Sequence, residues 1–500
     1  MSRPAFRLAL LAGLAVSLAA PPVADAASPF RRPKGAARAA APAPKPAPDV
    51  VAARLRDQAL KGSIAYGLVE DITTRFGPRM AGSESERRAA EWGAQELKRL
   101  GFVNVAVEDF PLQGWTRGQE SAEVTAPFRQ PLVVNALGGS PATPPGGIEA
   151  EAALFETYAD LQAAPTGSLN GKIAVVLQET ARVQTGAGYG ATSAIRSQGP
   201  DTAKAKGAVA FVLRSLGTHD HRFPHTGSTR RSEGAIPSFA ISPPDADQLR
   251  RIAERGPKDQ PLRLRLFSTA SDPAPGRSQN VVGEVRGREK PDEVIVIGGH
   301  LDSWDLGTGA VDDAAGVAIT TAALKLIADL PYKPRRTIRV VWWGSEELSQ
   351  PAPKPGLAGA QAYADARKDV LGGHVIASES DFGAGRIYSF VLPAGFAGSD
   401  LQKTAARVLA PLAINFDPSP ATSGGPDTGP LFQKGVPVFR LQQDGSDYFD
   451  VHHTPNDVID RIDPKAMDQN VAAWAALLWL IADSDVDFRN PPPPPAKPAS

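Results

Sequence analysis

The sequence contains no cysteine, so disulfide bonds, thiolate metal sites and a cysteine nucleophile are all excluded. An excess of charge is also missing, because 54 basic residues balance 54 acidic ones and the formal net charge is zero. That balance argues against nucleic acid as a partner. Histidine is scarce, with seven in 500 residues. Any metal must therefore be held by a few histidines together with carboxylates.

The composition is otherwise that of a globular protein with more than one domain. Hydrophobic residues make up 42% of the chain and charged residues 22%, a balance that excludes disorder throughout. The 500 residues exceed the ~250–300 that a single hydrophobic core usually serves. Glycine and proline number 47 each, well above their usual share, and we expect them in tails and loops.

Residues 1–26 have the pattern of a secretory signal peptide. Arg3 and Arg7 supply the positive start, residues 8–20 form a short apolar run, and residues 24–26 match the small-x-small cleavage pattern. The alternative is a membrane anchor, but the run is shorter than the ~20 residues that span a bilayer. No later stretch is apolar over a sufficient length. We therefore expect a secreted or periplasmic protein without a membrane span once the signal is removed.

The remainder of the chain divides into a main domain in two parts, an insert between them, and two proline-rich ends. The ends carry too little apolar surface to form a core. The insert contains short β-like runs, such as 173–177 and 209–213, between Gly/Pro-rich turns, which predicts a mostly β domain. The predicted boundaries are a linker at 27–52, the main domain at 53–115 and 278–488, the insert at 116–277, and a tail at 489–500.

The main domain is predicted to be α/β. In its first part, Ser83 and Glu86 form a capping box that starts a helix over 83–100. In its second part, apolar strands alternate with helices, which predicts a sheet covered on both faces. The strands are expected at 294–297, 337–343, 374–378 and 436–441, and the helices at 314–330, 356–367, 400–409 and 464–482. In such sheets, ligands bind at the carboxyl ends of the strands.

Histidines and carboxylates follow these predicted strands, where a ligand would bind. The candidate residues are His300, Asp302, Asp312, Glu346, Glu347, Asp381, His452 and His453. Each has an ordinary alternative, since loop histidines and turn carboxylates are usually solvated or hydrogen-bonded. Together they favour a metal centre, because neutral imidazole and carboxylate suit zinc and a dinuclear centre needs a bridging carboxylate. Of the two adjacent glutamates, one can bind metal while the other acts as the general base.

These residues lie within longer motifs that resemble the zinc exopeptidases of family M28, and within that family the carboxypeptidase Q branch. The matching segments are residues 76–83 (FGPRMAGS), 115–122 (WTRGQESA), 224–227 (PHTG), 299–305 (GHLDSWD), 346–347, 379–381, 452–453 and Asp457. The resemblance covers roughly residues 55–485. It implies a zinc-exopeptidase-type mixed sheet flanked by helices, an inserted, mostly β protease-associated domain, and peptides as substrates.

The resemblance implies a centre with two zinc ions. His300 and Asp381 would bind one ion, and Glu347 and His453 would bind the other. Asp312 would bridge both ions.

The resemblance also implies the catalytic groups. Glu346 matches the general base, and Asp302 matches the residue that orients the first histidine and fixes its tautomer. His452 occupies the position where glutamate-carboxypeptidase relatives place a tyrosine that hydrogen-bonds the developing oxyanion, and a solvated loop histidine is the alternative. The chain departs from its relatives at Asp313, where many have asparagine, and at residues 349–355, which lengthen a loop.

The expected function is a secreted dinuclear zinc exopeptidase that cleaves dipeptides or short peptides. A water bridging the metals would be the nucleophile, and Glu346 would take its proton. The sequence leaves the recognised terminus open, so an aminopeptidase acting on longer peptides is the main alternative. A glutaminyl cyclase, which uses one zinc, and a non-catalytic binding protein on the same fold are disfavoured by the complete ligand set. The insert is expected to shape the substrate cleft or a homodimer contact.

Overall fold

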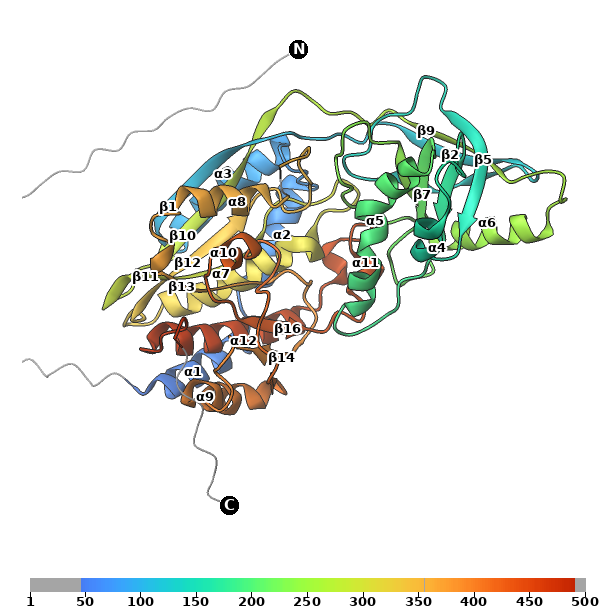
Figure 1. Cartoon of the computed structure of the whole chain (residues 1–500). Coiled ribbons are helices and arrows are strands. Elements are labelled where there is room, and N and C mark those ends of the chain that lie inside the picture. The colour runs from blue at the N-terminus through green and yellow to red at the C-terminus, as the bar shows by residue number, and fades with distance from the viewer. Residues whose placement is uncertain (1–45, 355, 491–500) are drawn as a thin grey trace, which may run out of the picture. The chain divides into compact units, whose positions relative to one another are not determined.

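The computed structural model describes residues 46–354 and 356–490, whose helices and strands are labelled in Figure 1. The predicted signal peptide at 1–26 lies outside these ranges. Most of the predicted linker and all but two residues of the predicted tail also lie outside them. Within the described ranges, no helix combines the length and apolar character needed to cross a membrane.

The folded region begins earlier than the sequence predicted. Helix α1 (Pro48–Ala59) starts inside the range assigned to the linker. Val51 and Ala52 are fully buried, and α1 packs against α12 (Pro464–Asp483). The reason is that apolar residues recur on one face of this segment, so that it can join the core as a helix.

A five-stranded sheet forms the centre of the main domain. Its strand order is β1-β10-β12-β11-β13, in which β11, β12 and β13 are parallel and β10 is antiparallel to both β12 and β1. The strands are β1 (Val103–Leu112), β10 (Gly276–Val285), β11 (Lys290–His300), β12 (Arg336–Trp343) and β13 (His374–Glu379). The predicted mixed sheet is confirmed, and its parallel strands point their carboxyl ends to one edge.

Helices cover both faces of this sheet, as predicted. Along β11, Ile295 and Ile297 enter one core, whereas Val294 and Val296 enter the other. The first core is completed by α2 (Ala65–Phe76), α3 (Glu84–Arg99), α7 (Ala315–Ala328) and α12, and the second by α8 (Ala358–Ala366) and α10 (Gly429–Gln433). Strand β11 is therefore buried on both sides, which explains why its sequence is a continuous apolar run.

Helix α3 begins at the predicted residue, but its capping box is incomplete. The Ser83 hydroxyl accepts a hydrogen bond from the Glu86 main-chain nitrogen. The Glu86 carboxylate does not return to Ser83. It accepts hydrogen bonds from the Gly82 main-chain nitrogen and from the Ser278 hydroxyl on β10, so it joins the helix start to the central sheet.

Residues between β1 and β10 form a second sheet, in which the described strands pair only with one another. Its order is β3-β2-β9-β5-β6-β7-β8-β4, and helices lie on both faces (Figure 1). The elements are β2 (Glu120–Ala126), β3 (Gln130–Leu132), β4 (Val134–Ala136), β5 (Ile148–Phe155), α4 (Tyr158–Ala163), β6 (Ile173–Val176), α5 (Ala187–Ala205), β7 (Ala210–Arg214), β8 (Ser238–Ile241), α6 (Pro243–Arg255) and β9 (Arg263–Ser268). Its helices were not predicted, and the domain boundaries stay a prediction.

A small third sheet corrects one predicted strand. Here β14 (Ile387–Val391) lies between β15 (Asn415–Asp417) and β16 (Arg440–Gln443), while α9 (Asp400–Leu409) matches its predicted range. The strand predicted at 436–441 therefore starts too early. In its first part, only Val438 forms an isolated bridge, to Ala377. Pro437 lacks the N–H that a regular ladder requires.

Candidate metal centre

Loops from separate elements meet at the carboxyl edge of the parallel strands. His300 is the last residue of β11, Glu346 and Glu347 follow β12, and Asp381 follows β13. Asp312 reaches the same place from an irregular turn that precedes α7. The adjacent histidines directly follow the short helix α11 (Tyr448–Val451), which comes after β16. The structure thus brings the predicted ligand residues together in one place.

One group of potential ligands contains His300, Asp312 and Asp381. The Nε2 atom of His300 lies 3.0 Å from Oδ1 of Asp312 and 3.7 Å from Oδ1 of Asp381. His300 and Asp312 are buried, and Asp381 is half-buried. All three can therefore direct one donor atom to a common point.

A second group forms on the other side of Asp312. The Nε2 atom of His453 lies 2.9 Å from Oε2 of Glu347 and 3.2 Å from Oδ2 of Asp312. Asp312 therefore presents Oδ1 to the first histidine and Oδ2 to the second. This is the arrangement expected of a carboxylate that lies between two cations.

The donor set fits zinc by two tests. Ligand atoms around a tetrahedral zinc with bonds of ~2.0–2.1 Å lie ~3.3 Å apart, and the distances in the two groups scatter around that value. In addition, Oε1 of Glu347 is buried without a hydrogen-bond partner among the described residues. No lysine or arginine in the described ranges forms an ion pair with Asp312, Glu347 or Asp381. Buried carboxylates require such a counter-charge, which a bound cation would supply.

Asp302 supports the centre differently from what the sequence predicted. Its side chain was expected to orient His300, but Oδ1 of Asp302 lies 3.8 Å from Nδ1 of that ring. Instead, the main-chain oxygen of Asp302 is 2.9 Å from Nδ1, and its carboxylate accepts hydrogen bonds from the main-chain nitrogens of Glu346 (3.0 Å) and Glu347 (3.2 Å). Asp302 therefore fixes the histidine and both glutamates at once.

The charges within the centre are strongly coupled. Burial alone would raise the pKa of Asp312, but hydrogen bonds from His300 and His453 hold that pKa well below its usual range. Burial likewise lowers the pKa of His453, yet Glu347 and Asp312 raise it to about 9. Burial raises the pKa of Glu346 well above its usual range, His300 lowers it, and Glu347 raises it further. A cation bound here would favour the ionised carboxylates and the neutral imidazoles.

His452 also reaches the centre. Its ring stacks on that of His453 with the centroids 3.5 Å apart, and its Nε2 atom lies 3.5 Å from Oδ2 of Asp312. Burial, and next the neighbouring His453, hold the pKa of His452 well below its usual range. The side chain of His452 is 8% exposed, so it is not the solvated loop histidine of the alternative interpretation.

A cavity of about 520 Å³ opens onto the centre. The predicted residues that line it include Glu346, Glu347 and Asp381. The insert contributes Tyr189 and Arg196 to the wall. Arg440 of β16 lines it as well, and sequence reasoning identified none of these three residues, because nothing in their local sequence marks them.

Trp304 is a further site residue that the sequence did not single out, although it lies in the motif at 299–305. Its indole N–H donates to Oε2 of Glu347 at 2.6 Å. The indole is buried against Gly138 of the insert, where an added Cβ would lie 1.9 Å from the ring. Trp304 therefore fixes one proposed ligand while packing against the insert.

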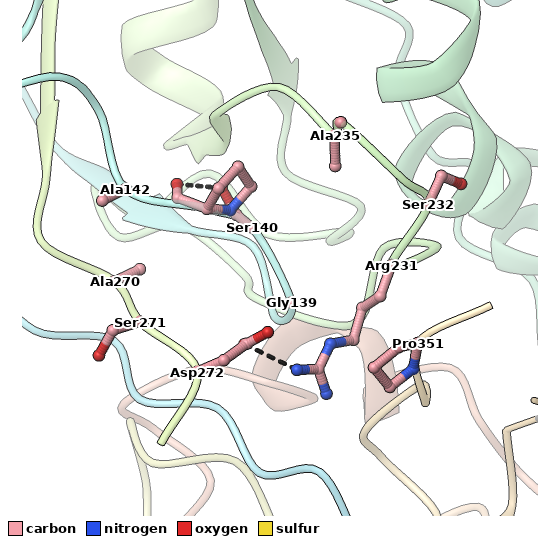
Figure 2. A pocket seen from close by; sticks show the side chains of 12 residues that line it. Gly139, Ser140, Ala142, Arg231, Ser232, Ala235, Ala270, Ser271, Asp272 and Pro351 are labelled. Atoms are coloured by element: carbon pink, nitrogen blue, oxygen red, sulfur yellow. Dashed lines mark hydrogen bonds and ion pairs between the residues drawn. The ribbon is translucent and has the colours of Figure 1, made fainter. Parts of the chain in front are cut away.

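Figure 2 shows another cavity, of about 390 Å³, between the insert and the loop at Pro351. None of the predicted site residues lines it. The guanidinium of Arg231 is already paired with Asp272 at 2.7 Å and hydrogen-bonded to the main-chain oxygens of Gln113 and Gly114. This cavity therefore offers no arginine that is free to bind a ligand.

Comparisons with known proteins agree with this geometry. The model of peptidase family M28 matches residues 280–478. Carboxypeptidase Q of Mus musculus is 34% identical over 427 residues, which are 84% of this chain and 85% of the mouse protein. The crystal structure of a peptidase M28 precursor from Shewanella amazonensis SB2B is 46% identical, with a TM-score of 0.84 over 89% of this chain and 99% of that chain. BSAP, a zinc aminopeptidase from Bacillus subtilis, shares the fold, with a TM-score of 0.59 and 18% identity over 85% of this chain and 96% of its own.

Proposed function

The chain belongs to peptidase family M28 and is a metallopeptidase, and from this we propose that it is a dinuclear zinc exopeptidase that hydrolyses dipeptides or short peptides. The observation that carries the proposal is the position of Asp312. Its two carboxylate oxygens face different histidines, His300 at 3.0 Å and His453 at 3.2 Å. A carboxylate in that position can be shared by two metals.

The proposed ligands divide between two positions. His300 and Asp381 would hold one zinc, Glu347 and His453 the other, and Asp312 would bridge them. When bound, zinc lowers the pKa of a coordinated water towards ~7 and polarises the substrate carbonyl.

Glu346 is the proposed general base. Its main-chain nitrogen is held by Asp302, and its carboxylate lines the cavity without an ion pair to any described residue. It can therefore accept a proton from the attacking water and deliver it to the leaving amine. The neighbouring Glu347, which accepts the Trp304 N–H and faces His453, is already engaged and suits the ligand role.

The charges of the cavity favour a free C-terminus as the recognised end of the substrate. Its acidic lining residues all belong to the centre, so none is left to bind an N-terminal ammonium group. By contrast, Arg196 and Arg440 line the cavity, and neither forms an ion pair with a carboxylate of the described residues. Arginine binds carboxylates well, so we propose dipeptidase or carboxypeptidase action over aminopeptidase action.

The test combines metal analysis with a panel of substrates. Zinc-loaded protein should contain two metals and hydrolyse unblocked dipeptides, but not C-amidated peptides. Hydrolysis of N-blocked peptides as well would identify a carboxypeptidase, and its absence a dipeptidase. Arg440→Gln should lower kcat/KM for unblocked dipeptides by ~10–100-fold, because a charged hydrogen bond is lost. Hydrolysis of C-amidated but not N-blocked peptides would reverse the assignment of the terminus. A zinc content of no more than one, or no hydrolysis of any of these peptides, would refute the proposed function.

Export is proposed on the pattern of residues 1–26. The mature protein is expected to start at Ala27, in the periplasm or outside the cell. Its N-terminal sequence after expression in the native host tests this, and an N-terminus at Met1 would contradict it.

A further inference from the structure

We propose that Arg117 of the insert is a positioning residue for the metal position formed by Glu347 and His453. The inference rests on the proposed two-metal function and adds a dependence of one metal position on the insert. Arg117 lies between β1 and β2 and is 9% exposed. Its guanidinium lies between two loops, each of which fixes one of these ligands.

The first loop, in the insert, fixes His453 through Thr226. The main-chain nitrogen of Thr226 donates to the main-chain oxygen of His453 at 3.0 Å, and Nδ1 of His453 lies 3.2 Å from the main-chain oxygen of Thr226. A neutral imidazole that binds metal through Nε2 carries its proton on Nδ1, so it must donate to Thr226. Arg196 lies 3.4 Å from the same Nδ1 but has only N–H groups to offer, so it cannot serve as that acceptor.

The backbone of His453 makes this support necessary. Its φ angle is 60°, in the left-handed region that non-glycine residues rarely adopt. Such a conformation persists only where the surroundings hold it in place. The paired hydrogen bonds with Thr226 do so, and Thr226 itself is 1% exposed.

The second loop, in the main domain, fixes Glu347 through Trp304. The indole N–H of Trp304 donates to Glu347, and the next residue along the chain is Asp305. Arg117 binds both oxygens of the Asp305 carboxylate, with Nε 2.8 Å from Oδ2 and Nη2 2.7 Å from Oδ1. This paired geometry fixes the direction of the loop as well as its position.

One side chain joins the two loops. Nη2 of Arg117 also donates to the hydroxyl of Thr226 at 3.1 Å, while Nη1 donates to the main-chain oxygen of Ala136. No described contact links Arg117 to His300 or Asp381, the ligands proposed for the other zinc. Loss of the arginine should therefore weaken one metal position and leave the other unchanged.

The expected size follows from the role of outer partners in metal sites. Removing a group that orients a metal ligand typically lowers the affinity ~10–100-fold. Arg117→Lys keeps the charge but cannot form the paired contact with Asp305. Asp305→Asn removes the charge from the other side and should weaken the same position. Because both changes break the same contact, the double variant should bind zinc at this position no less tightly than the more strongly affected single variant does.

The experiment measures zinc content of the full chain against a graded chelator, with Co²⁺ spectra and thermal unfolding alongside. Wild type should hold two metals. Arg117→Lys and Asp305→Asn should release one metal at ~10–100-fold higher free zinc than wild type does, and excess zinc should restore it. Arg214→Lys is the matched control, because Arg214 is similarly buried and pairs with Asp247 within the insert at 2.6 Å. Its metal content should equal that of wild type.

Four outcomes separate this inference from the proposed function. Unchanged affinity at both positions in Arg117→Lys and Asp305→Asn would overturn the inference and leave the two-metal function standing. Equal weakening of both positions, or the same loss in Arg214→Lys, would also overturn it, because the effect would then be general. A wild-type protein that holds fewer than two metals would overturn the proposed function itself.

Discussion

Replacing Glu346 by glutamine tests the proposed chemistry most directly. The change keeps the size and shape of the side chain but removes the group that would accept a proton. The Glu346 carboxylate forms no ion pair with a described residue, and the hydrogen bond that fixes this position comes from its main-chain nitrogen. The nearby charges of Glu347 and Asp381 raise the pKa of Glu346, so removing its negative charge lowers the repulsion among these carboxylates. We therefore expect Glu346→Gln to fold and bind both metals as well as wild type does.

The expected loss is confined to turnover. Removal of a general base typically lowers kcat by ~10²–10⁴-fold, which corresponds to ~2.7–5.4 kcal/mol in the activation barrier. KM should change little, because the cavity wall and the proposed metal ligands are untouched. A base works only when ionised, so wild-type turnover should fall as the pH drops through the pKa of Glu346. The residual activity of the variant should lack that dependence.

Steady-state rates on an unblocked dipeptide, zinc content and the melting temperature together decide the outcome. Glu347→Gln is the control, because Glu347 faces His453 at 2.9 Å and accepts the Trp304 N–H at 2.6 Å. That variant should lose one metal as well as its activity. Near-normal turnover of Glu346→Gln would refute the assignment of the base. Loss of a metal from Glu346→Gln would show that the two glutamates have exchanged roles.

Three further predictions test other parts of the structure. His452→Ala should lower turnover by ~10²–10³-fold with both metals bound, whereas His453→Ala should lose a metal. Metal analysis and steady-state rates on both variants check this. Unchanged kinetics of His452→Ala would exclude an oxyanion role. Trp304→Phe should lower affinity at the Glu347 position ~10–100-fold, measured by chelator competition, and wild-type affinity would contradict it. Burial lowers the pKa of His374 from 6.5 to about 4. The unfolded chain takes up this proton at a higher pH than the folded protein does. The free energy of unfolding is therefore unaffected by His374 above pH 6.5 and decreases by ~3 kcal/mol as the pH falls towards 4. Denaturant unfolding across this range should show a weaker acid dependence for His374→Gln, and identical curves would refute the interpretation.

Some of the proposed ligand residues could be predicted from the sequence because they follow apolar strands. His300 ends such a strand and Glu347 comes shortly after another, so the α/β pattern alone places both at one edge. Asp312 and His453 were harder, because they lie on an irregular turn and in a loop. The resemblance to relatives, and not the local pattern, is the basis of the roles proposed for them.

The individual contacts that the insert makes with the centre could not be predicted, for a physical reason. Thr226 and His453 are 227 positions apart, and Arg117 and Asp305 are 188 apart, so no local periodicity reports that they touch. Arg117 and Thr226 do lie within motifs that resemble the family. A sequence motif marks a residue as shared with the family, but it does not show which residue it contacts in the folded protein.

The pairing of β1 with β10 sets a condition on how the chain can fold. Leu112 lies opposite Gly276, so the two ends of the insert are neighbours across an edge pair of the central sheet. The chain must loop out the whole insert before this pair can close. Such closure is slow in an extended chain, although its entropic cost rises only gradually with the length of the loop. We expect the second sheet to form first and bring its own ends together, so that the central sheet completes late in the order of assembly.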